Sequence, residues 1–205
     1  MRALVTGGAK RLGREISVYL ANRGYDVAVH YNSSENEALD VAKEINSQGR
    51  LSECLKCDLL IEDQVKALVP LASEALGGPI SMLVNNASIF EHDSFDDATR
   101  ASWDRHMESN LRAPFVLTQA FSKQSPSPIL DKKNEPISQG LVLNMIDQRV
   151  KKLTPDFASY TIAKMGLWAM TQTAARALAP NIRVNAIGPG PTSVSYTHLT
   201  LPTKA

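Results

Sequence analysis

The feature that most constrains this chain is a regular alternation between short apolar runs and longer amphipathic stretches. Strands that alternate with crossover helices produce this pattern. It predicts an α/β fold: a doubly wound parallel sheet with helices on both faces. The strands are predicted at Ala3–Thr6, Tyr25–Tyr31, Leu51–Cys57, Ile80–Asn85, Leu141–Ile146 and Ile182–Ile187, and the helices at Arg11–Arg23, Glu35–Gln48, Glu62–Leu76, Ala98–Phe121 and Phe157–Ala179.

Composition narrows the class of partner. The chain has 205 residues, enough for one domain with a buried core, and its formal net charge is only +1. So weak a charge predicts neither a nucleic-acid nor a membrane partner and favours small-molecule chemistry. The apolar runs are far shorter than the roughly 20 residues of a membrane span, and the N-terminus lacks the pattern of a secretory signal. We therefore expect a cytoplasmic protein.

Two segments need separate interpretation. Lys123–Gln139 is polar, contains three prolines and is predicted to be a surface insertion. Cys54 and Cys57 have C-x-x-C spacing, which invites a redox or zinc interpretation, but no second ligand pair accompanies them. Because residues three apart on a strand point to opposite faces, two buried thiols are the better prediction, and no metal site is expected.

The last thirteen residues, Ser193–Ala205, do not continue the α/β pattern. One reading frame of a transposase adapter used in DNA sequencing resembles a coding sequence for Val194–Thr203. We interpret the segment as translated adapter; the alternative is a genuine short tail. The predicted organisation is one cofactor-binding domain over 1–192, truncated after its sixth strand, followed by a non-native tail over 193–205.

A glycine-rich turn, Thr6–Gly13 (TGGAKRLG), lies between the first strand and the first helix. In a Rossmann-type fold this position holds the pyrophosphate of a dinucleotide. Small residues let the backbone approach the phosphates, and the helix N-terminus offers unpaired N–H groups. The turn therefore predicts a dinucleotide site.

Three further motifs follow in order: Asn85–Ser88 (NNAS), the Tyr160–Lys164 pair (Y-x-x-x-K) and Pro189–Gly190. With the glycine-rich turn, they make residues 2–192 resemble the short-chain dehydrogenase/reductase family. That family's members are oxidoreductases with a Rossmann-type fold, and they usually form tetramers through two long helices and a C-terminal strand. The resemblance implies the same fold and activity here, and a homo-oligomer, a tetramer when the chain is full length.

Two departures refine the resemblance. Arg11 stands where the family has the second glycine of the turn, and Asp147 stands where it has a catalytic serine, thirteen residues before Tyr160. Together with Lys10 and the segment 85–90 (NNASIF), these positions resemble the pteridine reductase and dihydromonapterin reductase branch.

The chemistry of Tyr160 and Lys164 can be argued directly. Positions i and i+4 share one face of a helix, so the phenol and the ammonium stand together. A neighbouring cation favours phenolate, which predicts a lowered pKa for Tyr160 and a role in proton exchange. The resemblance implies that Lys164 also holds the nicotinamide ribose. An isolated Y-x-x-x-K pair on an exposed helix would carry no function.

Two more residues complete the predicted constellation. Asn110 is a poor residue for a helix interior, and the resemblance implies that it holds a water connecting Lys164 to solvent. The alternative is an exposed helical asparagine. Asp147 ends the fifth strand at the carboxyl edge of the sheet, where an ionised carboxylate would suit the N–H groups of a nitrogen heterocycle better than a developing alkoxide. The alternative is an aspartate that caps a turn.

The cofactor prediction rests on charge. NAD enzymes of this architecture carry an acid at the end of the second strand, but His30–Ser34 contains none, while Lys10 and Arg11 offer cations to a 2′-phosphate. The predicted cofactor is NADP(H). Its predicted contacts are Thr6, Gly7, Lys10, Arg11, Leu12, Gly13, His30, Tyr31, Asn32, Ser33, Ser34, Asp58, Leu59, Asn86, Ala87, Ser88, Tyr160, Lys164, Pro189, Gly190 and Thr192.

These inferences predict an NADPH-dependent oxidoreductase that transfers a hydride to a small, pterin-like heterocycle. Two alternatives remain: a carbonyl or 3-oxoacyl reductase of the same family, and a non-catalytic NADP-binding regulator. Phe90 is predicted either to stack on the substrate ring or to pack within its loop. The predicted catalytic residues are Tyr160, Lys164, Asp147 and Asn110, and the predicted substrate contacts are Arg11, Ser88, Phe90, Asp147 and Tyr160.

Overall fold

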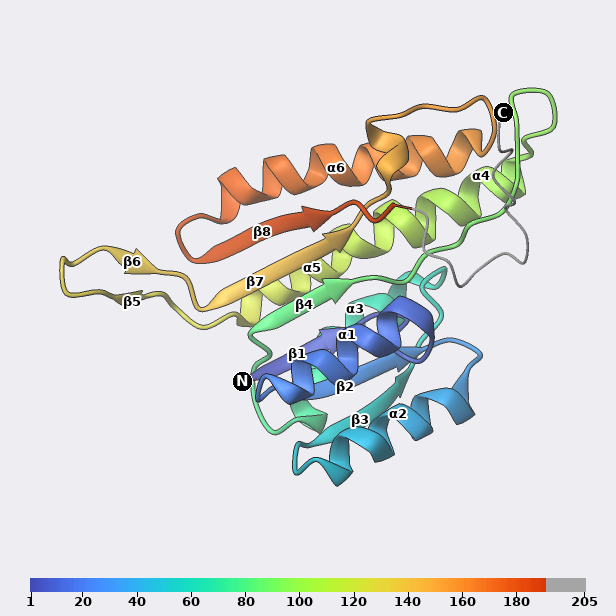
Figure 1. Ribbon diagram of the computed structural model, residues 1–205. Helices are drawn as coiled ribbons and strands as arrows, with labels where there is room; N and C mark the ends of the chain where they lie inside the picture. Colours follow the sequence, from blue (N-terminus) through green and yellow to red (C-terminus); the bar gives the residue numbers. More distant parts are fainter. Residues whose placement is uncertain (191–205) are drawn as a thin grey trace, which may run out of the picture.

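A computed structural model describes residues 1–190 of the chain and has the predicted α/β architecture. Six parallel strands form one sheet in the order β3-β2-β1-β4-β7-β8 (Figure 1). The order changes direction at β1, so a crevice opens between the carboxyl ends of β1 and β4, where such sheets bind ligands. The strands are β1 (Arg2–Val5), β2 (Asp26–Tyr31), β3 (Ser52–Lys56), β4 (Met82–Asn85), β7 (Gly140–Met145) and β8 (Ile182–Ile187).

Helices cover the sheet on two sides, each over its own apolar cluster. The helices α1 (Arg11–Asn22) and α2 (Glu35–Ser47) pack on one face, around residues such as Val5 and Val29. The other face carries α3 (Glu62–Ala75), α5 (Ala113–Gln124) and α6 (Ala158–Leu178). Cys57 packs in this second cluster and Cys54 against the first, as their opposite orientation on the strand predicted.

The predicted helix Ala98–Phe121 is divided in the structure. It consists of α4 (Arg100–Met107), a π-helical segment η1 (Glu108–Arg112) and α5, which follow one another without a break. Thr99 begins the helix with a capping box, accepting from the backbone N–H of Ser102. A π-helical segment inside an α-helix is frequent at functional sites, and this one contains Asn110.

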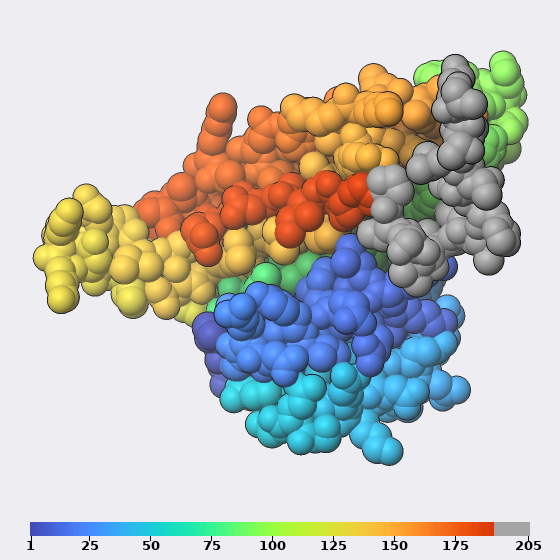
Figure 2. All heavy atoms as spheres, in the orientation of Figure 1, coloured from blue at the N-terminus to red at the C-terminus, as the bar shows by residue number. Residues whose placement is uncertain are grey.

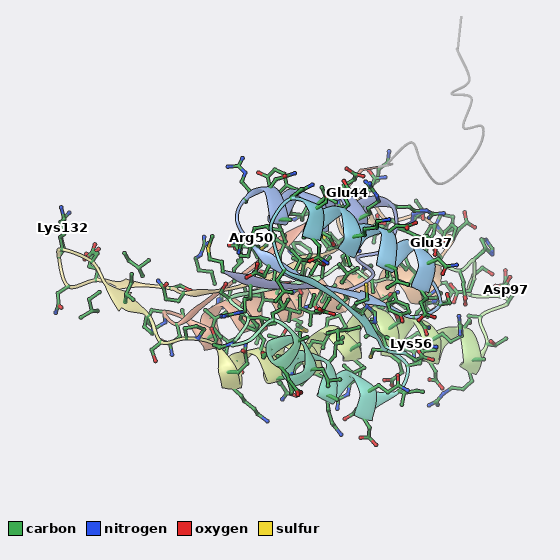
Figure 3. All side chains as sticks on the ribbon, turned by 90° about the horizontal axis from the view of Figure 1, so that it is seen from below. Glu37, Glu44, Arg50, Lys56, Asp97 and Lys132 are labelled. Carbon is green, nitrogen blue, oxygen red and sulfur yellow. The ribbon has the colours of Figure 1, made fainter. Side chains whose placement is uncertain are left out.

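The predicted surface insertion contains a small hairpin of β5 (Ile129–Leu130) and β6 (Pro136–Ile137). It projects from the body of the molecule at one end of the sheet (Figure 2). Lys132, at its tip, lies at the end of the molecule opposite Asp97 (Figure 3). The hairpin strands pair only with each other, so this element lies apart from the crevice.

Within residues 1–190, no helix covers β8 on the face that α1 and α2 share, and this strand lies at the surface (Figure 2). Its side chains alternate accordingly: Val184 is buried, whereas Arg183 and Ile187 are exposed. The described helices include none long and apolar enough to cross a membrane, and the described side chains include no acid, histidine and cysteine cluster able to hold a metal ion. The predicted boundary at residue 192 and the segment 193–205 lie outside the described residues.

Candidate active site

The glycine-rich turn is fixed to the sheet by side chains that turn inward. The hydroxyl oxygen of Thr6 accepts from the backbone N–H groups of Asn86 (2.9 Å) and Ala87 (3.0 Å). The amide of Asn86 in turn donates to the carbonyl oxygens of Thr6 (2.9 Å) and Gly7 (3.2 Å). These contacts join the loop after β1 to the loop after β4. Thr6 and Asn86 therefore shape the turn, because their side chains form hydrogen bonds to the backbone of the two loops.

His30 has a similar internal role. Its Nδ1 accepts from the backbone N–H of Gly7 (2.9 Å), and its Nε2 lies 3.0 Å from the carbonyl oxygen of Cys57. Because Nδ1 is an acceptor, Nε2 carries the proton and the ring is neutral. Burial lowers the pKa of His30 to about 4, which agrees with this assignment. His30 thus links the ends of β1, β2 and β3. Tyr31 beside it packs in the apolar cluster on the sheet face that α1 and α2 cover.

A cleft of about 470 Å³ lies above the turn. A side chain on Gly13 could not fit there, because its Cβ would lie 2.0 Å from the carbonyl oxygen of Gly7. The structure brings many of the predicted cofactor residues together around this cleft, and it adds Leu60, Ile89, Arg105 and Ser109, which carry no recognisable motif. The predicted residues that line the cleft are Gly7, Lys10, Arg11, Leu12, Gly13, His30, Asn32, Asp58, Leu59, Asn86, Ala87 and Ser88.

The two predicted phosphate-binding cations differ in their surroundings. Lys10 forms an ion pair with Glu37 at 2.6 Å, and both side chains are about half exposed. Arg11 has no carboxylate partner within residues 1–190. Its backbone is left-handed, with φ of +49°, the conformation that the glycine usual at this position adopts freely. Both cations line the cleft. Sequence reasoning missed Glu37, which lies six residues beyond the end of β2 at Tyr31.

Asp147, Tyr160 and Lys164 lie together at the carboxyl end of β7. The hydroxyl of Tyr160 donates to Oδ2 of Asp147 at 2.9 Å, while Oδ1 of the same carboxylate accepts from the backbone N–H of Arg149 at 2.8 Å. Asp147 therefore caps the turn η2 (Gln148–Val150) and also contacts the tyrosine. The Nζ of Lys164 donates to the carbonyl oxygen of Met145 at 2.8 Å and lies 5.7 Å from the centre of the Tyr160 ring.

The pKa of Tyr160 is shifted in the opposite direction from the one predicted. Burial raises it well above the ordinary value, and the charge and hydrogen bond of Asp147 raise it further. Lys164 does not reverse this shift, because its ammonium faces the tyrosine ring and Met145 rather than the hydroxyl. Burial also lowers the pKa of Lys164 to about 8, partly opposed by Asp147. In this state Tyr160 holds its proton at neutral pH.

Asn110 is fully buried in the π-helical segment. Its Oδ1 accepts from the backbone N–H of Ile89 at 2.9 Å, and its Nδ2 donates to the carbonyl oxygen of Ile89 at 2.8 Å. The extra residue in the π-helical turn lets the asparagine face the loop after β4 rather than solvent. Asn110 therefore clamps the loop that carries Ser88 and Phe90.

The aromatic side chains of the site form a short stack. Phe90 lies edge-on to Tyr160, with ring centres 4.7 Å apart, and stacks on Phe157 at 4.2 Å with an angle of 8° between the planes. The guanidinium of Arg149 lies 4.7 Å from the centre of the Phe157 ring and 5.5 Å from that of Phe90. Sequence reasoning missed Phe157 and Arg149, although one stands three residues before Tyr160 and the other two residues after Asp147.

A buried polar network lies beneath Tyr160. The Nδ1 of His106 lies 2.6 Å from the hydroxyl of Ser159, which also bonds to Asp93, and the backbone N–H of Glu91 donates to Nε2 of His106 at 3.2 Å. Since Nε2 accepts, Nδ1 donates to Ser159, and the serine hydroxyl donates to the carboxylate. The network joins the loop after β4 to the start of α6, and sequence reasoning did not identify it.

Several predicted cofactor contacts do not line the cleft: Thr6, Tyr31, Ser33, Ser34, Tyr160, Lys164, Pro189 and Gly190. Ser33 and Ser34 follow β2. Pro189 and Gly190 follow β8 beside η2, where a Cβ on Gly190 would lie 3.9 Å from Oε1 of Gln148. Thr192 lies outside the described residues.

Comparisons with known proteins agree with this arrangement. FolM alternative dihydrofolate reductase 1 from Brucella canis, solved in complex with NADP, is 46% identical, with a TM-score of 0.83 over 92% of this chain and 72% of that one. The same protein from Brucella suis, also solved with NADP, is 46% identical, with a TM-score of 0.84 over 93% and 75%. The 3-oxoacyl-acyl-carrier-protein reductase FabG of Staphylococcus epidermidis is 32% identical over 92% of this chain and 73% of its own length.

The family model for short chain dehydrogenases matches residues 1–204. Together with the Rossmann-type sheet, this match confirms the predicted fold class and the prediction of an oxidoreductase. The chain belongs to the short chain dehydrogenase family.

Proposed function

We propose that this chain is an NADPH-dependent reductase of a small pterin-like heterocycle. The observation that carries the proposal is the contact of 2.9 Å between the Tyr160 hydroxyl and the Asp147 carboxylate, beside the ring of Phe90. A carboxylate accepts hydrogen bonds from the N–H groups of a pterin ring, and a neighbouring phenol can supply a proton to a ring nitrogen. The 46% identity to proteins named as dihydrofolate reductases supports the same substrate class.

The cleft above the glycine-rich turn fits a dinucleotide phosphate. Backbone N–H groups and the start of α1 face it, and no side chain fills it at Gly7 or Gly13. Arg11 suits a phosphate because its guanidinium has no carboxylate partner within the described chain. The relatives solved with NADP support the choice of NADP(H) over NAD(H).

The bound cofactor would supply a hydride from its nicotinamide ring. Tyr160 is the proton donor in our proposal, and its raised pKa suits reduction, because the hydroxyl still carries its proton at neutral pH. Asp147 receives the tyrosine hydrogen bond and orients the heterocycle. After the proton leaves, the ammonium of Lys164, 5.7 Å from the centre of the tyrosine ring, offsets part of the charge on the tyrosinate.

The remaining proposed roles follow from position. Lys164 holds the nicotinamide ribose, and Asn110 fixes the loop that carries Ser88 and Phe90 and orders a water that connects Lys164 to solvent. Phe90 offers an apolar face, 36% exposed, on which a planar ring can stack. We also propose that copies of the chain associate through α5 and α6 into a homo-oligomer.

A second candidate function is reduction of a carbonyl or a 3-oxoacyl thioester, which the 32% identity to FabG favours. Reduction of a ketone develops negative charge on oxygen, and an ionised Asp147 beside that oxygen would repel it. The same carboxylate suits a protonated ring nitrogen. Asp147 therefore favours the heterocycle.

The test is an assay of NADPH oxidation with dihydrobiopterin, acetoacetyl-coenzyme A and a panel of simple ketones. We expect turnover with dihydrobiopterin at least tenfold above that with any ketone or thioester. Preference for acetoacetyl-coenzyme A would support the second candidate. NADPH binding without turnover of any substrate would indicate a regulator.

A further inference from the structure

Arg149 lies beside the pair of stacked rings Phe90 and Phe157. The turn η2 presents it two residues after Asp147, and its guanidinium carbon lies 4.7 Å from the centre of the Phe157 ring and 5.5 Å from that of Phe90. Contact with two aromatic rings orients a guanidinium and leaves its terminal N–H groups able to donate hydrogen bonds. Phe90 also contacts Tyr160, so the guanidinium lies close to the reacting end of the site.

The positive charge of Arg149 is not neutralised within residues 1–190. No carboxylate there forms an ion pair with it, and its Nε is buried without a hydrogen-bond partner. Two acids close to it in the sequence have other partners: Asp147 accepts from Tyr160, and Asp156 lies 3.6 Å from His92. The site therefore has an oriented guanidinium with no anion of its own.

Other cations around the site do have partners. Lys10 is paired with Glu37 and Arg105 with Glu91, while Lys151, two residues beyond Arg149, lies over the ring of Trp168 at 4.1 Å. Arg11 belongs to the cofactor cleft. Arg149 is thus the cation beside Phe90 that has no carboxylate partner in the described chain.

We propose that Arg149, supported by Phe157, binds a carboxylate on the tail of the substrate. This inference rests on the proposed function and extends it: the substrate is a pterin-like ring whose substituent ends in an acid, rather than one with a neutral side chain. The ring stacks beside Phe90 with its nitrogens at Asp147, and the tail runs along the aromatic stack to the guanidinium. Arginine can hold a carboxylate through two parallel hydrogen bonds, which gives the site its selectivity.

The test compares dihydrofolate, which carries a glutamate tail, with dihydrobiopterin, whose tail is neutral. Steady-state kcat/KM is measured with both substrates for the full chain and for Arg149→Gln, Arg149→Lys and Lys151→Gln. Lys151→Gln is the matched control, because it removes a neighbouring cation that faces Trp168. Thermal unfolding by circular dichroism shows whether each variant is folded.

We expect Arg149→Gln to shift the ratio of the two kcat/KM values about tenfold away from dihydrofolate, mainly through KM. Arg149→Lys should shift it less, and Lys151→Gln should leave the ratio within about twofold. An Arg149→Gln ratio equal to that of the unaltered chain would overturn the acidic-tail site while leaving the pterin assignment intact. An unaltered chain that reduces ketones but neither dihydropterin would instead overturn the proposed function, and the tail site with it.

Discussion

Arg11 occupies a backbone conformation that most side chains avoid. Its φ of +49° is the one a glycine would adopt at this place in the turn, so an arginine here carries strain. This conformation places Arg11 in the lining of the cofactor cleft. We infer that the arginine lowers the local stability of the turn and in return contacts the cofactor phosphate.

The variant Arg11→Gly tests both effects, on stability and on cofactor binding. Relief of the left-handed strain should raise the free energy of unfolding by about 0.5 to 1 kcal/mol. Loss of the guanidinium should weaken NADPH binding by about 1.5 to 3 kcal/mol, with little effect on NADH. Denaturant unfolding and cofactor titration measure the two effects. Arg23→Gly, at the other end of α1, serves as the control and should neither raise the free energy of unfolding nor weaken NADPH binding. A lower free energy of unfolding for Arg11→Gly would refute the strain argument.

The buried Lys164 predicts that both kcat/KM and stability depend on pH. Burial lowers its pKa to about 8, so it loses its charge as the pH rises through that value. If the charged ammonium is required, kcat/KM should fall about tenfold per pH unit above about 8. The unfolded chain retains that proton more tightly, so stability should rise between pH 8 and the ordinary pKa of 10.5. Lys164→Arg, which stays charged, should lack the fall; a level profile up to about pH 10 in the unaltered chain would contradict this role.

Motif spacing predicted which residues lie near the site better than it predicted what their side chains contact. Tyr160, Lys164 and Asp147 meet as expected because strand ends and helix faces impose their positions. Thr6, His30 and Asn86 also lie at the turn, but their side chains bond to the backbone of neighbouring loops. Such contacts depend on how three loops meet, which no single segment specifies.

At the scale of the elements, the strands and helices follow the predicted ranges to within about three residues, because hydrophobic periodicity determines them. The π-helical segment and the network of His106, Ser159 and Asp93 were not predictable in this way. A π-helical turn depends on one extra residue being accommodated by packing, and the network joins residues more than fifty positions apart. Both connect the loop after β4 to the helix that carries Tyr160.

Ser159→Ala tests the network. It would leave the buried Asp93 carboxylate and the Nδ1–H of His106 without their shared partner, and we expect a loss of about 2 to 4 kcal/mol of stability. Turnover should fall as well, because Tyr160 is the next residue. Ser122→Ala, which removes an exposed hydroxyl that donates to Gln119, is the control and should cost under about 0.5 kcal/mol. Equal unfolding midpoints for both variants would show that the network contributes nothing.

At the scale of the whole molecule, the exposed apolar surfaces of the described chain include two of different shape. One is the hairpin β5–β6, with Ile129 54% exposed, and the other is a groove of about 700 Å³ between α5 and α6 that includes Phe115, 41% exposed. The groove is lined mainly by apolar side chains, among them Leu111 and Met170. A groove of this kind between two long helices suits association with another copy better than a narrow projecting hairpin does.

Phe115→Glu should therefore shift the protein toward the monomer, because a buried unpaired carboxylate is costly at an apolar interface. Light scattering after size-exclusion chromatography measures the mass. Ile129→Glu introduces the same charge on the hairpin and should leave the assembly unchanged. A mass that falls only with Ile129→Glu would place the interface on the hairpin instead.

The central claim is that the carboxylate of Asp147, paired with Tyr160, selects a nitrogen heterocycle over a carbonyl. Its most direct test is the ratio of kcat/KM for dihydrobiopterin to that for acetoacetyl-coenzyme A, measured in the unaltered chain and in Asp147→Ser. A serine can still bond to Tyr160 and to a carbonyl but cannot accept from ring N–H groups as a carboxylate does. We expect the ratio to fall at least 100-fold in Asp147→Ser, with dihydrobiopterin activity lost and thioester activity kept or gained. A ratio that stays the same, or a serine variant that reduces dihydrobiopterin as well as the unaltered chain does, would contradict the account.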